Sequence, residues 1–131
     1  MLDRIDLHVE VTPVAYNELS SSLKFEKSEC IRDRVIHARE IQAVRYNNYP
    51  GIYANAQMSS KMLKEICRIS SAGQNLLKNA MQKLNLSARA YDRILKVSRT
   101  VADLSGSNDI NPEHLAEAIQ YRSLDREGWG A

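Results

Sequence analysis

The chain has 131 residues, of which 44% are hydrophobic and 26% are charged, and this fits one folded domain rather than a disordered chain. No run approaches the roughly 18 apolar residues that a membrane span needs, so a membrane protein is not expected. Eighteen Lys and Arg against sixteen Asp and Glu leave a net charge of +2, which by itself indicates no nucleic-acid partner.

The first dozen residues alternate between apolar and polar side chains, which is the pattern of a β-strand. The apolar side consists of Ile5, Leu7, Val9 and Val11, and the polar side of Asp6, His8, Glu10 and Thr12. No second strand-like run follows, and an isolated strand cannot satisfy its own backbone groups. We therefore expect its sheet to be missing, and the strand to be disordered, to fold back on the helices or to pair with another copy.

Helical periodicity replaces the alternation after Pro13 and a polar connection. A long amphipathic helix is predicted over about residues 28 to 46. Its apolar stripe consists of Ile31, Val35, Ala38, Ile41 and Val44. Residues 46 to 55 carry three tyrosines and are predicted to form an irregular connection anchored by aromatic packing.

Serines mark the starts of three further helices. The caps are Ser59 or Ser60, Ser70 or Ser71, and Ser87, whose helix runs to about Leu104. A last helix is expected to begin with Asn111 as N-cap and Pro112 in the first helical position. The sequence thus predicts a mainly α protein, a bundle of about five helices with a short N-terminal strand, ending in a frayed tail around Trp129.

The sequence lacks the motifs of a self-sufficient enzyme. There is no G-x-x-x-x-G-K-[ST] loop, and the five glycines are scattered, so this chain alone is not expected to hold the phosphates of ATP. His8, His37 and His114 are far apart and form no metal-binding motif. Cys30 and Cys67 lie outside any C-x-x-C pair and no signal peptide is recognisable, so we expect two free thiols in the cytoplasm.

Arg89 has the sharpest functional interpretation. The Ser87 cap places it at the second position of its helix, where the helix dipole and unpaired N–H groups already create a positive potential. An arginine there is locally unfavourable unless an anion binds, and Arg93 lies one turn later on the same face, so a phosphate contact is one hypothesis. The alternative is a solvated face whose side chains pair among themselves. That face, which projects away from the apolar stripe, consists of Arg89, Asp92, Arg93, Lys96 and Asp103.

A nucleic-acid role stays open on two other features. The arginines of the long helix could follow a phosphate backbone, although acidic residues interleave with them. These arginines are Arg32, Arg34, Arg39 and Arg45, and the acidic residues are Glu29, Asp33 and Glu40. The tyrosines at 46, 49 and 53 could stack bases, although packing is their commoner role where no basic groove is evident.

Several segments resemble Mg chelatase-like AAA+ proteins of the ComM type. The similar segments are LDRIDLHVEV at 2–11, NAQ at 55–57, LSARAYDRILKV at 86–97, RTVADL at 99–104 and EAIQYR at 117–122. They cover nearly the whole chain, and the run from 86 to 104 is long and specific. Ser98 stands where this family usually has alanine.

This resemblance implies that residues 1–24 are the end of an AAA+ core and residues 25–131 a C-terminal helical lid. In such a lid, Arg89 matches the sensor 2 arginine that contacts the γ-phosphate of ATP, and Arg93 is a further candidate ligand. Arg4 matches an arginine finger, which would act in trans on the ATP of the adjacent subunit, although on composition alone it is a surface residue.

The resemblance also implies ATP and Mg²⁺ as cofactors of the full-length protein, with none bound by this part alone. The implied partners are the AAA+ core of its own chain and a homo-oligomeric ring, expected to be a hexamer, with DNA as a further candidate and no membrane. The implied parent activity is ATP-driven DNA translocation or branch migration, not Mg chelatase chemistry. The rival interpretations are a DNA-binding helical module and a protein-interaction domain.

Overall fold

The computed structural model describes residues 4–20 and 25–122, so the expected frayed tail around Trp129 lies outside the described residues. The elements are α1 (Tyr16–Ser20), α2 (Ser28–Arg45), the 3₁₀ helix η2 (Asn55–Gln57), α3 (Ser60–Ile66), α4 (Ser71–Lys83), α5 (Ala88–Leu104) and α6 (Pro112–Gln120). The mainly α class is confirmed, and α2 to α6 are the five helices that the sequence predicts. The short α1 lies in the segment that was expected to be a polar connection.

Three serines begin helices as predicted. The Oγ of Ser59 accepts a hydrogen bond from the backbone N of Met62 at 3.3 Å, and the Oγ of Ser70 accepts one from Gly73 at 3.2 Å. At α6, Pro112 occupies the first helical position, where its missing N–H costs nothing. Side-chain caps satisfy N–H groups that a helix leaves unpaired, so these starts follow from local sequence.

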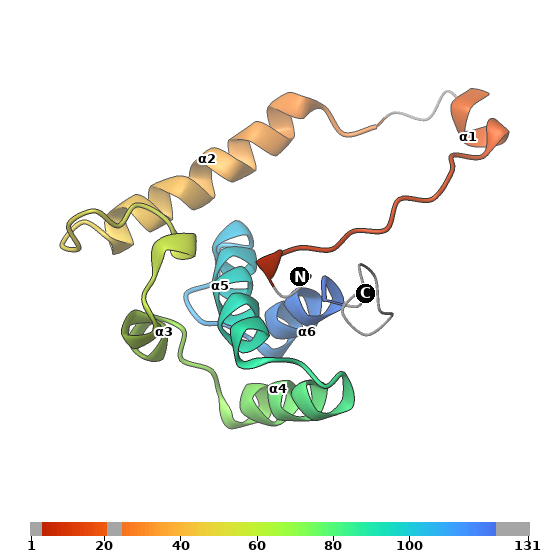
Figure 1. Ribbon diagram of the computed structural model, residues 1–131. Coiled ribbons are helices and arrows are strands. Elements are labelled where there is room, and N and C mark those ends of the chain that lie inside the picture. The colour runs from red at the N-terminus through yellow and green to blue at the C-terminus, as the bar shows by residue number, and fades with distance from the viewer. Residues whose placement is uncertain (1–3, 21–24, 123–131) are drawn as a thin grey trace.

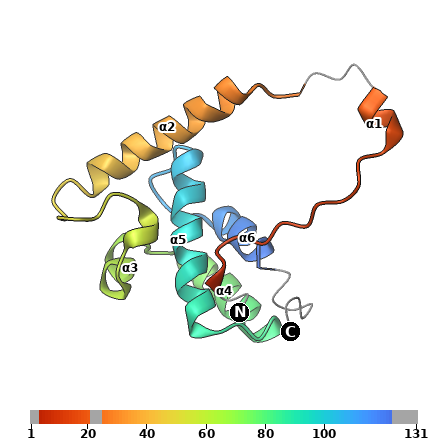
Figure 2. The same cartoon turned by 45° about the horizontal axis from the view of Figure 1, so that its top comes forward.

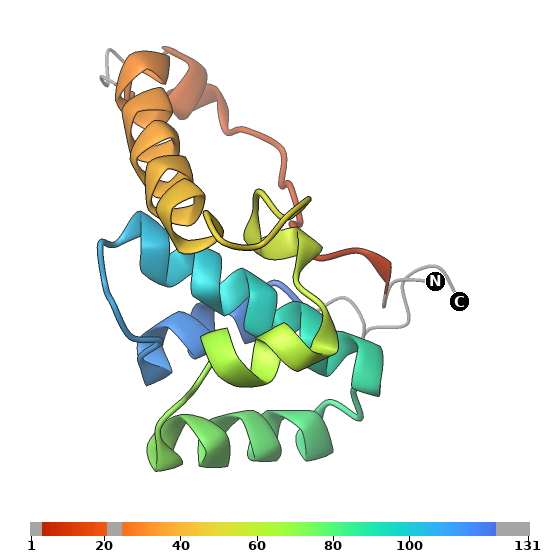
Figure 3. The same ribbon diagram turned by 90° about the vertical axis from the view of Figure 1, so that its left-hand side faces the viewer.

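Helix α5 is the centre of the bundle. It contacts α2, α3, α6 and η2, while α4 packs on α6 (Figure 1). Turned by 90°, the molecule shows α5 between α2 on one side and α4 on the other (Figure 3). Fully or nearly fully buried apolar side chains line this centre, among them Ile94, Ala102, Leu115 and Ala118. Burial of such side chains contributes most of the stability of a bundle this small.

The packing of α4 on α6 depends on a residue without a side chain. A Cβ atom added to Gly73 would lie 2.9 Å from Cδ1 of Leu115, closer than real Cβ contacts. Leu115 is itself fully buried, so it has little room to move away. Gly73 therefore sets how closely the two helices approach.

The predicted N-terminal strand is not formed. The residues that the structure describes contain no strand, and β-type pairing occurs among them as an isolated bridge between Ile69 and Ile110. Residues 4–8 instead fold back against the helices, where His8 is buried, whereas Val11 is 86% exposed. The alternation is real, but a strand needs a neighbouring strand to bond with, and none is present here.

The predicted apolar stripe of α2 is buried only near its middle. Ala38 is buried and Ile41 is half-buried, whereas Ile31, Val35 and Val44 are 45%, 40% and 79% exposed. Figure 2 shows the first half of α2 extending beyond the other helices. The helix is about 27 Å long at 1.5 Å per residue, which exceeds what the bundle can cover.

The two cysteines are free, as expected, and we predict that they differ sharply in reactivity. Cys30 is exposed, while Cys67 is buried and burial raises the pKa of its thiol to about 11. Thiolate is the reactive form, so Cys67 should be protected while the fold is intact. Alkylation at pH 8 followed by mass spectrometry should label Cys30 first and Cys67 only after denaturant is added. Equal labelling of both in the native state would contradict the packing around α3.

Within the two described ranges, no helix combines the length and the apolar character needed to cross a bilayer.

Candidate functional site

The N-terminus of α5 is built as the sequence predicts. The Oγ of Ser87 accepts a hydrogen bond from the backbone N of Ala90 at 3.1 Å, so Ser87 is the cap of this 17-residue helix. Arg89 then occupies the second helical position, and it is exposed. A guanidinium therefore lies on the surface beside the positive end of a long helix, which is an arrangement that favours a bound anion.

Arg93, one turn further along, forms an ion pair with Asp6 from the N-terminal segment. The side chains of Arg93 and Asp6 are 29% and 48% exposed, so solvent screens the pair and its contribution to stability is small. The pair nevertheless fixes a position, because it joins residues that are 87 apart in the sequence.

Two hydrogen bonds to backbone carbonyl oxygens extend this attachment to the residues that directly follow α6. The backbone N of His8 donates to the carbonyl oxygen of Tyr121 at 2.8 Å, and the buried Arg122 donates to the carbonyl oxygen of Ile5. Arg4 is exposed and directly precedes this attached segment. In Figures 2 and 3 the segment begins beside the N-terminal half of α5. The structure thus places residues 5–8 against Arg93 of α5 and the residues that follow α6, and Arg4 directly precedes them in the sequence.

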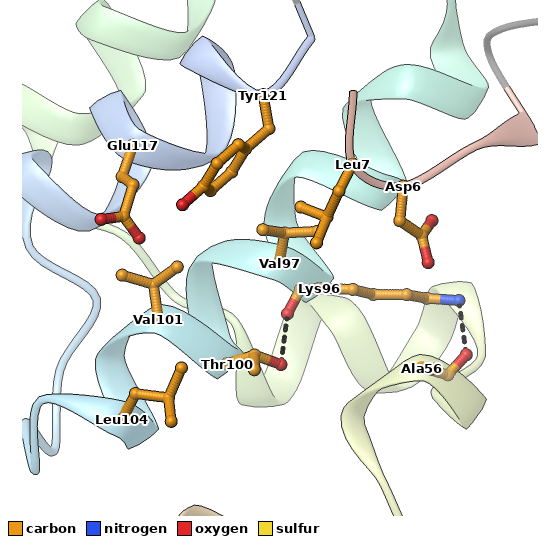
Figure 4. A pocket seen from close by; sticks show the side chains of 10 residues that line it. All are labelled: Asp6, Leu7, Ala56, Lys96, Val97, Thr100, Val101, Leu104, Glu117 and Tyr121. Atoms are coloured by element: carbon orange, nitrogen blue, oxygen red, sulfur yellow. Dashed lines mark hydrogen bonds between the residues drawn. The ribbon is translucent and has the colours of Figure 1, made fainter. Parts of the chain in front are cut away.

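An apolar cavity of about 280 Å³ lies next to this segment, between α5, α6 and η2 (Figure 4). Leu7 and Val97 point toward each other at one side, and the Nζ of Lys96 donates to the carbonyl oxygen of Ala56 at 3.2 Å. Arg89 and Arg93 are not among its lining residues. The cavity is therefore suited to apolar contacts and not to a phosphate group.

The C-terminal end of α5 holds a buried polar cluster that we call the Asp103 junction, formed by Arg45, Asn55, Arg99 and Asp103. Arg45 of α2 donates to both carboxylate oxygens of Asp103, with Nη1 to Oδ2 at 2.8 Å and Nη2 to Oδ1 at 2.6 Å. The Asp103 side chain is fully buried and that of Arg45 is 18% exposed. Two parallel charge-assisted bonds fix orientation as well as distance, so α2 and α5 are joined in one geometry.

Asn55 connects η2 to the same junction. Its Oδ1 accepts from Nη1 of Arg45 at 3.0 Å and from the hydroxyl of Tyr46 at 2.6 Å. Its Nδ2 donates to Oγ1 of Thr100 at 3.0 Å and to Oδ2 of Asp103 at 2.9 Å. A side-chain amide is the group that can accept two bonds and donate two, and Asn55 uses all four.

Arg99 completes the junction from one turn before Asp103. It approaches the carboxylate at 3.2 Å, and its two terminal nitrogens donate to the carbonyl oxygens of Asn108 and Ser107 at 2.9 and 2.8 Å. Burial would raise the pKa of Asp103, but hydrogen bonds from Arg45 and Asn55 and the charges of Arg45 and Arg99 outweigh it and hold the pKa below its usual range. Asp103 is therefore a buried carboxylate whose negative charge two arginines compensate.

This geometry tests the expectations for Asp103 and for the three tyrosines. Asp103 does not project into solvent, and the prediction that it belongs to an exposed face is wrong because its partners come from α2 and η2. Tyr46 is buried with its hydroxyl on Asn55, and Tyr49 packs edge-on against it at 6.1 Å, which confirms packing for these two rings. Tyr53, in contrast, is 76% exposed.

This domain is a mainly helical bundle around one central helix, α5. The capped end of α5 carries arginines, and its other end is joined to the long helix α2. The family described as "Magnesium chelatase, subunit ChlI C-terminal" matches residues 25–122, and the chain belongs to this family.

Relatives with curated sequences agree with this family. Over 95% of this chain, it is 41% identical to "Competence protein ComM" of Haemophilus influenzae and 37% identical to "Uncharacterized protein YifB" of Escherichia coli. It is 34% identical to "Uncharacterized protein Rv2897c" of Mycobacterium tuberculosis over 93% of the chain. In each case the chain spans 24% of the length of the relative.

Proposed function

We propose that this domain is the helical lid of a Mg chelatase-like AAA+ ATPase and that Arg89 senses bound ATP through its γ-phosphate. The position of Arg89 is the observation that carries the proposal. It is an exposed guanidinium at the second residue of a helix whose cap is already occupied by Ser87. The local field there is positive, so an incoming phosphate would be attracted both by the end of the helix and by the guanidinium.

Arg93 supports the site in a different way from Arg89. It pairs with Asp6, so a phosphate that reached Arg93 would have to compete with a carboxylate already in place. We therefore assign phosphate sensing to Arg89 and keep Arg93 as a secondary ligand that also secures residues 4–8. The ATP and its Mg²⁺ would be held by the core of the full-length protein.

Arg4 is the proposed arginine finger of the same assembly. The contacts of Asp6, His8 and Ile5 attach the segment that follows Arg4 to Arg93 of α5 and to Tyr121 and Arg122 after α6. In a homo-oligomeric ring, expected to be a hexamer, this exposed arginine would act on the ATP of the adjacent subunit. The parent activity we propose is ATP-driven DNA translocation or branch migration.

DNA binding by α2 itself is less favoured than the lid. Arg45 is committed to Asp103, and Arg34 pairs with Glu26, so two of the four arginines on this helix already have acidic partners. Direct DNA binding would appear as an affinity that falls steeply with salt concentration. Absence of binding by the domain at low salt would remove this alternative.

The proposal is tested by the nucleotide preference of the full-length protein with Arg89→Ala. Losing one charge-assisted contact to the γ-phosphate should weaken ATP binding about tenfold or more and leave ADP binding nearly unchanged. Calorimetry with ADP and a slowly hydrolysed ATP analogue measures both affinities. Arg39→Ala is a matched control, since Arg39 is also an exposed arginine on a helix. Equal affinities of wild type and Arg89→Ala for the ATP analogue would refute γ-phosphate sensing.

A further inference from the structure

We infer that the Asp103 junction is a positioning device for Arg89, which rests on the proposed function and deepens it. The junction and Arg89 lie at opposite ends of α5. Four hydrogen bonds join the neighbouring elements to α5: two from Arg45 of α2 to Asp103, and two from Asn55 of η2 to Thr100 and Asp103. Arg45 and Tyr46 also donate to Asn55, and Arg99 donates to Asp103 within α5. Such a saturated buried network has one arrangement, so it fixes the direction in which α5 points.

The length of α5 makes its direction matter. Arg89 and Asp103 are fourteen residues apart on one helix, which corresponds to roughly 21 Å along its axis. A tilt of about 5° at the junction would move Arg89 by about 2 Å, and misplacing a catalytic contact by roughly 1 Å can cost about 100-fold in rate. A small loosening at the junction is therefore amplified at the arginine.

The chemistry of the junction also exceeds what packing alone requires. Buried ion pairs are weak stabilisers compared with apolar residues of similar volume, because desolvation of both charges offsets their attraction. Here Arg45, Arg99 and Asp103 are all drawn into the interior around a single carboxylate. Because its bonds are bidentate, such a cluster also fixes the relative orientation of the helices that it joins.

The test uses Arg45→Lys in the full-length protein that carries this domain. Lysine keeps the charge but cannot form two parallel bonds to Asp103. We expect kcat for ATP hydrolysis to fall about tenfold, and binding of the slowly hydrolysed ATP analogue to weaken as in Arg89→Ala with ADP binding nearly unchanged, at a temperature where the variant is fully folded. Arg34→Lys is the matched control and should have no effect, because Arg34 lies on the same helix as Arg45 but pairs with the exposed Glu26, which precedes that helix. Thr100→Val, which removes one bond of Asn55, serves if Arg45→Lys does not fold.

The decisive comparison is the double variant Arg45→Lys with Arg89→Ala. If the junction acts through Arg89, Arg45→Lys should have no further effect on kcat once Arg89 is gone. The inference would be overturned if the two changes lowered kcat by independent, multiplying factors. It would also be overturned if the loss of kcat followed only the folded fraction of the protein. If the proposed function itself is wrong, the result is distinguishable, because Arg89→Ala alone would then leave ATP turnover unchanged.

Discussion

Replacing Asp103 with alanine should strongly destabilise the domain. The change removes the carboxylate on which Arg45 and Arg99 converge, and leaves two guanidiniums without their partner in a largely buried site. Breaking a buried pair in this way costs about 3–5 kcal/mol, a large part of the total stability of a small domain. Urea denaturation followed by circular dichroism measures the loss.

Asp33→Ala on the exposed side of α2 is the control for this change, and should alter stability by no more than about 0.5 kcal/mol. A cost of Asp103→Ala as small as that of the control would contradict the burial of the junction.

The dependence of stability on acidic pH gives a second measurement. Since the pKa of Asp103 is lowered in the fold, its contribution is present above about pH 3.9 and is lost as the pH falls through its folded-state pKa. The stability gap between wild type and Asp103→Asn should narrow over that range.

Replacing Arg4 with alanine should have the largest effect on turnover. An arginine finger stabilises charge in the transition state of phosphoryl transfer, and its loss costs about 10³-fold or more. Because Arg4 is exposed, its removal should leave the fold intact. Steady-state ATP hydrolysis by the full-length protein, in a preparation shown by sedimentation to form rings, measures the effect.

If Arg4 acts on the ATP of the adjacent subunit, its loss should also affect rings that mix variant and wild-type subunits. Adding Arg4→Ala subunits to wild-type subunits should lower turnover in proportion to the mixed interfaces, whereas Arg32→Ala subunits, which lose an exposed arginine of α2, should not. Undiminished turnover of pure Arg4→Ala rings would show that the arginine is a surface residue.

The helices could be predicted because their signals are local. Ser59, Ser70 and Ser87 each cap a helix from within three residues, and the period of apolar side chains identifies the helices between them. Arg89 could be singled out for the same reason, since its position in the helix is set by a cap two residues away. What these signals cannot specify is which elements meet.

The Asp103 junction was missed because its contacts are distant in sequence. Arg45 and Asp103 are 58 residues apart, and Asn55 and Asp103 are 48 apart. Arg99 and Asp103, four residues apart on one helix, were the available sign of a paired carboxylate. The strand prediction was wrong for a related reason. Alternation predicts an extended conformation, but a strand also needs a neighbouring strand, and residues 5–8 bond to the end of α6 instead.

The central claim, that Arg89 couples this lid to the chemistry of ATP, is tested most directly by single-turnover ATP hydrolysis in the full-length protein. Arg89→Ala should slow the chemical step by about 10²-fold, the usual cost of removing one preorganised donor from a developing charge. Arg39→Ala, measured beside it, should hydrolyse ATP at the wild-type rate. A chemical step that is equally fast in wild type and in Arg89→Ala would contradict the account and leave Arg89 a solvated residue of α5.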